Sequence, residues 1–77
     1  MSVVVYTKPS CVQCDQTKRF LDKTNIPYTT VDITVDTEAF DKLIEMGFKA
    51  APVVITDSES WAGFNPSKLN KLAEEWV

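Results

Sequence analysis

Hydrophobic and polar residues follow one another along the chain with two periods, one typical of strands and the other of helices. Strands are predicted at Val3–Tyr6, a short β-branched run, and at Tyr28–Ile33 and Val53–Thr56. The turn residues "DSE" come after the third of these, so "SWA" at residues 60–62 is expected to return as a short fourth strand.

Two helices are predicted between these strands. Helix formers fill Cys14–Thr24, where Phe20 and Leu21 lie on one side. A second helix is expected to begin after Asp36 as its N-cap and to end before Gly47, which suits the left-handed C-terminal position. The apolar face of this helix, at i, i+3 and i+4, is expected to hold Phe40, Leu43 and Ile44.

The last helix carries the most complete set of signals. Asn65 is a good N-cap and Pro66 suits the first helical position. Phe64 is placed to pack on Leu69, one turn inside the helix. The expected apolar stripe consists of Leu69, Leu72, Ala73 and Trp76.

The element order βαβαββα predicts an α/β fold in which a four-stranded mixed sheet is flanked by three helices. A right-handed crossover should set the first two strands parallel. No linker, internal repeat or low-complexity tract divides residues 1–77, so we expect one domain.

Composition and charge narrow the classes of partner. The 77 residues are 44% hydrophobic and 25% charged, and the net charge is -3, with no run of Lys or Arg. We therefore expect a protein or a small molecule as partner, and neither nucleic acid nor a membrane. No apolar stretch approaches the roughly 18 residues of a membrane span and no signal peptide is evident, so the cytoplasm is the expected location.

The stretch "YTKPSCVQC" brings Cys11 and Cys14 directly after the first strand. A structural disulfide between them would close a very short loop and would stabilise the fold by only about 2 kcal/mol on the loop-entropy relation. Structural zinc needs four Cys or His ligands, and the chain has two Cys and no His. A metal or iron–sulfur cluster shared between two chains remains a third reading. Beside a βαβ pattern, Cys-x-x-Cys favours a redox pair.

The spacing of the two thiols suits reversible disulfide chemistry. Residues i and i+3 in a first helical turn have Cβ atoms roughly 5–6 Å apart, close enough for a small adjustment to make or break the bond. At a helix N-terminus, with Lys8 nearby, Cys11 is expected to have a lowered pKa and to attack. Cys14, one turn inside and next to Asp15, is expected to be less exposed and to resolve.

Three motifs together resemble one family. "YTKPSCVQC", "APVV" and "WAGFNP" occur in the order and spacing of the NrdH redoxins, the glutaredoxin-like electron donors of class Ib ribonucleotide reductase. The resemblance implies a thioredoxin fold, a protein disulfide as substrate, and reduction by thioredoxin reductase. It also implies a cis Ala51–Pro52 peptide bond beside the cysteines. We expect no cofactor and no metal, and a monomer.

A glutathione-dependent glutaredoxin is the alternative. Such proteins usually carry Cys-Pro-Tyr-Cys and a Gly-Gly pair followed by an acid that holds the amino group of the tripeptide. Here Gly63 is preceded by Ala62 and followed by Phe64, so that clamp is missing. The chain also departs from the usual NrdH motif, because Ala62 and Asn65 stand where that motif has Ser and Arg.

The residues expected to contact a partner surround the two cysteines. Lys8 could instead be a solvated loop charge, and Trp61 and Phe64 could be core or capping residues. Val12 and Gln13 lie between the thiols, where a docking partner would meet them. The complete predicted partner surface comprises Lys8, Val12, Gln13, Ala51, Pro52, Trp61, Gly63 and Phe64.

Overall fold

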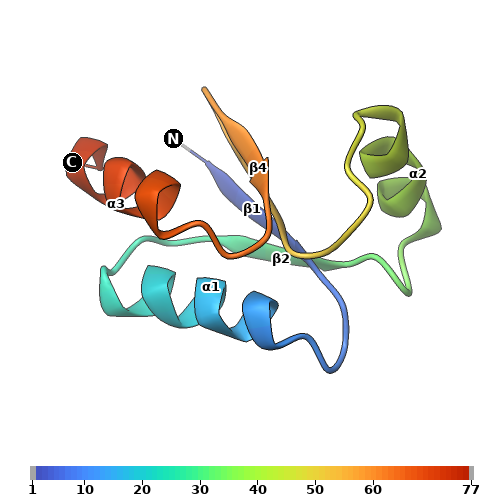
Figure 1. The fold of residues 1–77 in the computed structure, drawn as a ribbon, viewed down its shortest axis with the longest axis horizontal. Coiled ribbons are helices and arrows are strands. Elements are labelled where there is room, and N and C mark those ends of the chain that lie inside the picture. The colour runs from blue at the N-terminus through green and yellow to red at the C-terminus, as the bar shows by residue number, and fades with distance from the viewer. Residues whose placement is uncertain (1, 77) are drawn as a thin grey trace.

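The computed structural model describes residues 2–76, so Met1 and Val77 at the two ends of the predicted domain lie outside the described residues. The predicted order of elements is confirmed (Figure 1). The elements are β1 (Val3–Thr7), α1 (Val12–Lys23), β2 (Thr29–Asp32), α2 (Thr37–Glu45), β3 (Val53–Thr56), β4 (Ser60–Ala62) and α3 (Pro66–Glu75).

The four strands form one mixed sheet in the order β2-β1-β3-β4. β1 and β2 are parallel, as expected for strands joined by a helix, whereas β1–β3 and β3–β4 pair antiparallel. Val5 in β1 lies opposite Thr30 on one side and Val54 on the other. The predicted four-stranded mixed sheet is therefore confirmed.

The main hydrophobic core lies between the sheet and helices α1 and α3. Alternate residues of β1, Val3 and Val5, point to this face and are 2% and 0% exposed. Leu21 of α1 and Leu69 of α3 are fully buried against them. The core cluster consists of Val3, Val5, Leu21, Ile26, Val54, Trp61, Leu69 and Leu72.

Helix α2 stands apart from α1 and α3 (Figure 1), and it packs on the opposite face of the sheet, where Tyr6 and α2 residues line a common hollow. Of the three residues predicted on its apolar face, Leu43 is buried, at 3% exposure. Phe40 and Ile44 are 43% and 47% exposed, so this face is covered only in part. Within residues 2–76, α1 and α3 both pack elsewhere, and neither covers the flank of α2.

The helix ends follow the predicted capping chemistry with one difference. The side chains of Asp36 and Asn65 accept hydrogen bonds from the backbone N–H groups of Ala39 (3.0 Å) and Lys68 (3.1 Å), as N-caps do. Gly47 has φ +92° just beyond α2, as expected. Helix α1, however, begins at Val12, two residues before the predicted start at Cys14. Its N-cap is Cys11, and cysteine is not among the residues that N-cap preferences favour, so these preferences did not indicate the earlier start.

Some ends of the elements also lie one or two residues from their predicted positions. Thr7 still belongs to β1, and β2 omits Tyr28 and Ile33. Trp76 follows the end of α3 in an extended conformation, although it remains packed against the core. Fraying and local hydrogen bonding set such ends, which a hydrophobic pattern does not record.

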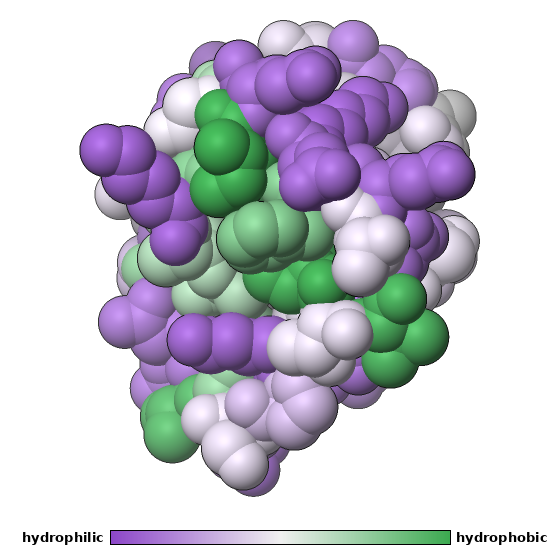
Figure 2. Space-filling model, turned by 90° about the vertical axis from the view of Figure 1, so that its right-hand side faces the viewer, coloured by the Kyte–Doolittle hydropathy of each residue, from purple (hydrophilic) through white to green (hydrophobic). Residues whose placement is uncertain are grey.

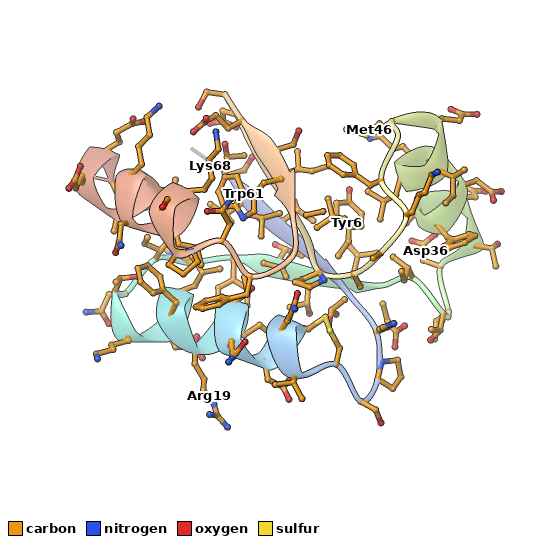
Figure 3. All side chains as sticks on the ribbon, in the orientation of Figure 1. Tyr6, Arg19, Asp36, Met46, Trp61 and Lys68 are labelled. Atoms are coloured by element: carbon orange, nitrogen blue, oxygen red, sulfur yellow. A yellow bond between two sulfur atoms is a disulfide. The ribbon has the colours of Figure 1, made fainter. Side chains whose placement is uncertain are left out.

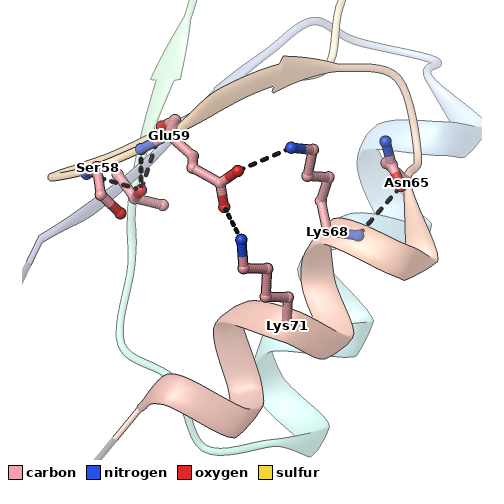
Figure 4. A network of polar contacts seen from close by, with 6 residues as sticks. Ser58, Glu59, Asn65, Lys68 and Lys71 are labelled. Atoms are coloured by element: carbon pink, nitrogen blue, oxygen red, sulfur yellow. Dashed lines mark hydrogen bonds and ion pairs between the residues drawn. The ribbon is translucent and has the colours of Figure 1, made fainter.

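A small charged network ties the turn between β3 and β4 to α3 (Figure 4). The Glu59 carboxylate accepts a hydrogen bond from Lys68 Nζ at 2.7 Å and lies 3.9 Å from Lys71 Nζ. The hydrogen bond from Lys68 holds the pKa of Glu59 below its ordinary value of 4.5. The network fixes the start of α3, which directly follows the "WAGF" segment.

Acid should weaken this connection. Since the pKa of Glu59 is lowered in the folded state, its stabilising effect is present above pH 4.5 and is lost as the pH falls through the folded-state pKa. Urea unfolding of the wild type and of Glu59→Gln should therefore differ at neutral pH and converge in acid. A stability difference that stays constant down to about pH 3 would exclude this ion pair as its source.

Candidate functional site

Cys11 lies at the N-cap of α1 and carries the site. Its Sγ accepts a hydrogen bond from the backbone N–H of Cys14 at 3.1 Å. The preceding residue, Ser10, has φ +56°, which turns the chain from the loop into the helix. A sulfur in this position faces the N–H groups at the helix start, and these stabilise a thiolate. The geometry favours nucleophilic attack by Cys11.

Cys14 forms a disulfide with Cys11, and the two Cα atoms are 5.2 Å apart. The bond is visible as the yellow link at the start of α1 (Figure 3). Cys14 is fully buried, whereas Cys11 is 9% exposed. Cys14 is therefore the less exposed of the two, as predicted, and its role as the resolving thiol stays a prediction.

Gln13 connects the cysteine motif with the segment before α3. Its Oε1 accepts a hydrogen bond from the backbone N–H of Phe64 at 3.3 Å. Gly63 has φ +79°, and a Cβ added there would lie 3.4 Å from the same oxygen. The positive φ is the reason for glycine here, because a Cβ would make only ordinary contact with Gln13.

The "APVV" segment joins the same cluster. The Ala51–Pro52 peptide bond is cis, as the family resemblance implied. The Pro52 carbonyl accepts a hydrogen bond from the Gly63 N–H at 2.8 Å, and the proline itself is buried. Three motifs that are far apart in the sequence thus meet at the N-terminal end of α1.

The other predicted contact residues differ in what they can offer a partner. Val12 is 71% exposed immediately beside Cys11, and Gln13 is also exposed. Phe64 is half-buried and packs on the core cluster, and Trp61 is only 6% exposed within it. Trp61 therefore presents little surface to a partner, whereas Val12 presents most of its side chain.

Lys8 lies on a hollow that sequence reasoning did not predict. The hollow has a volume of about 350 Å³, and its lining residues are Lys8, Ile33, Thr34, Phe40, Lys49, Ala50 and Ala51. Lys8 precedes Cys11 by three residues, so the wall of the hollow is within roughly 11 Å of that cysteine along the chain. The missed signal was a pair of lysines, Lys8 three residues before Cys11 and Lys49 two residues before Ala51.

Within residues 2–76, no group of three or more His, Cys, Asp or Glu side chains is arranged to hold a metal ion. No helix in the same range is long and apolar enough to cross a membrane.

Comparison with known proteins gives a consistent result. The Glutaredoxin family model matches residues 3–61. The chain is 44% identical over 71 residues to the glutaredoxin-like protein NrdH of Lactococcus lactis subsp. cremoris, covering 92% of this chain and 99% of that protein. It is 36% identical over 72 residues to NrdH of Escherichia coli, covering 94% and 89%.

The fold agrees with these sequence matches. The structure of the glutaredoxin-like protein NrdH-redoxin from Escherichia coli superposes with a TM-score of 0.91 at 36% identity, covering 94% of this chain and 95% of that one. That protein is described as having a thioredoxin-like activity profile.

Proposed function

We propose a function for this chain on the basis of its family: it belongs to the glutaredoxin family and, within it, to the NrdH redoxins. In this proposal Cys11 and Cys14 carry electrons from thioredoxin reductase to class Ib ribonucleotide reductase. The chain is a thiol–disulfide oxidoreductase with a Cys-x-x-Cys centre. The observation that carries the choice of partners is the near full-length similarity to NrdH proteins. Its expected setting is the cytoplasm, where it would act as a single-domain monomer.

The reaction proceeds by two thiol–disulfide exchanges. The Cys11 thiolate attacks one sulfur of the partner disulfide, which forms a mixed disulfide and releases the first partner thiol. The Cys14 thiolate then attacks Cys11 Sγ, which closes the Cys11–Cys14 disulfide and releases the second partner thiol. Two electrons pass to the partner, and its two released thiolates take up protons. Thioredoxin reductase would return two electrons to Cys11–Cys14 and so restore the dithiol.

The backbone before Pro52 supports docking of an extended partner segment. Ala51 is only partly buried, and no backbone hydrogen bond ties it to the described residues. An extended chain can pair with such open N–H and C=O groups while its disulfide approaches Cys11. Val12 and Gln13 would then contact the segment on the other side of the cysteines.

The proposed function is tested by reconstituting the whole electron path. Class Ib ribonucleotide reductase, thioredoxin reductase and NADPH should form deoxyribonucleotide at a rate proportional to the concentration of this protein. Omitting thioredoxin reductase, or replacing the protein with Cys11→Ser, should reduce the rate to background. Equal product formation without this protein would refute the proposal.

A further inference from the structure

The hollow beside the disulfide has an apolar wall and a basic rim. Phe40 and Ile33 contribute the large apolar side chains that line it, and Lys8 and Lys49 are its charged residues. No acidic side chain lines it. Although the whole chain has a net charge of -3, this part of the surface therefore carries positive charge.

The two lysines are available to a ligand. Both are exposed, and neither forms an ion pair with the residues from 2 to 76. By contrast, Lys68 and Lys71 are both engaged with Glu59. A carboxylate that reached the hollow would not have to displace an internal partner from Lys8 or Lys49.

The apolar surface extends beyond the hollow along α2. Phe40 also lines a second, smaller hollow that it shares with Leu43, Ile44 and Phe48. Phe40, Ile44 and Met46 are 43%, 47% and 44% exposed. Figure 2 shows this face of the molecule, with hydrophobic residues gathered near its centre and hydrophilic residues around them. An apolar surface that continues beyond one small hollow suits a peptide segment better than a single small ion.

Resting on the proposed function, we propose that this surface binds an acidic segment with an apolar side chain, located next to the reactive disulfide of the protein substrate. The apolar side chain enters the hollow against Phe40, and neighbouring carboxylates pair with Lys8 and Lys49. The segment runs past Ala51, which lines the same hollow. Partner selection thus depends on the residues that flank the substrate disulfide as well as on the disulfide itself.

Synthetic substrates can test the charge preference without either protein partner. One disulfide-closed peptide carries an arm of Glu, Asp and Leu, a second has Lys in place of each acid, and a third has no arm. The reduced protein is mixed with each peptide, and the rate constant is divided by that of the armless peptide. The peptide with the acidic arm should be reduced about three- to tenfold faster than the peptide with the basic arm at low salt. This ratio of rate constants should fall at high salt.

Charge reversal assigns the preference to the hollow. Lys49→Glu should remove or invert the ratio between acidic and basic arms. Lys23→Glu makes the same change in net charge at the exposed far end of α1 and should preserve the ratio. Equal ratios for the two arms in the wild type, or equal effects of the two variants, would overturn the proposal.

A second pair of variants tests the apolar contact. Replacing the Leu of the acidic arm with Ser should slow the reaction several-fold in the wild type. Phe40→Ala should abolish that difference, whereas Val35→Ala, which truncates an exposed apolar side chain that lines neither hollow, should retain it. Retention of the Leu preference by a folded Phe40→Ala variant would refute the contact. Since no reductase or ribonucleotide reductase takes part, these outcomes are independent of the reconstituted assay.

Discussion

Replacing Cys14 with serine should turn the protein from a catalyst into a trap. Cys11 would still attack a partner disulfide, because it is the more exposed sulfur and lies at the N-cap of α1. The second exchange would fail for lack of a resolving thiol, so a mixed disulfide through Cys11 should accumulate. Intact mass spectrometry after incubation with an oxidised partner, followed by peptide mapping, identifies the bonded cysteine.

The reciprocal variant provides the control. Cys11→Ser retains a thiol at position 14, but that residue is fully buried in the wild type. Both turnover and trapping should fall to background, with the fold unchanged by circular dichroism. Trapping through Cys14 in this variant, or wild-type turnover by it, would reverse the two roles.

Thioredoxin reductase should reduce the Cys11–Cys14 disulfide much faster than glutathione does. A glutathione site needs an acid for the amino group of the tripeptide, and here apolar Phe64 follows Gly63. The Asn65 side chain that comes next is already used as the cap of α3. Loss of one hydrogen bond to a charged group costs about 1.5–3 kcal/mol, or roughly tenfold to a hundredfold in affinity. The preference is measured by NADPH oxidation at matched protein concentration, with thioredoxin reductase in one assay and with glutathione and glutathione reductase in the other.

Asn65→Asp is the matched variant for this preference. Aspartate caps a helix as well as asparagine does, so stability should be retained. Glutathione activity should remain low, because the second glycine of the clamp is still missing: Phe64 stands between Gly63 and residue 65. If the wild type turned over equally fast with both reductants, the chain would function as a glutathione-dependent glutaredoxin.

The sequence was informative wherever one residue type has one strong local role. Asp36 and Asn65 cap helices, and Gly47 ends one, because few other residues satisfy those backbone positions. The cysteine pair at a helix start could likewise be placed from its spacing. The cis Ala51–Pro52 bond, by contrast, was expected from family resemblance alone, since most bonds of this kind are trans.

The pattern of hydrophobic and polar residues did not predict contacts between residues that are far apart in the sequence. The hydrogen bond between Gln13 and the Phe64 N–H joins residues separated by 51 positions, and neither residue signals it. The apolar spacing of Phe40, Leu43 and Ile44 marked one face of a helix, but helical periodicity does not tell whether another element covers that face, and Phe40 and Ile44 are exposed. The same limitation concealed the hollow between Lys8 and Lys49, which forms only when the two loops meet.

A single-turnover measurement tests the central claim most directly. The reduced protein is mixed in equal amounts with the oxidised large subunit of class Ib ribonucleotide reductase, without any reductase, and free thiols are alkylated after a short interval. The account predicts that Cys11 and Cys14 form a disulfide and are therefore not alkylated, while the subunit gains two thiols. If Cys11 and Cys14 each carried an alkyl label and the subunit gained no thiol, the account would be contradicted.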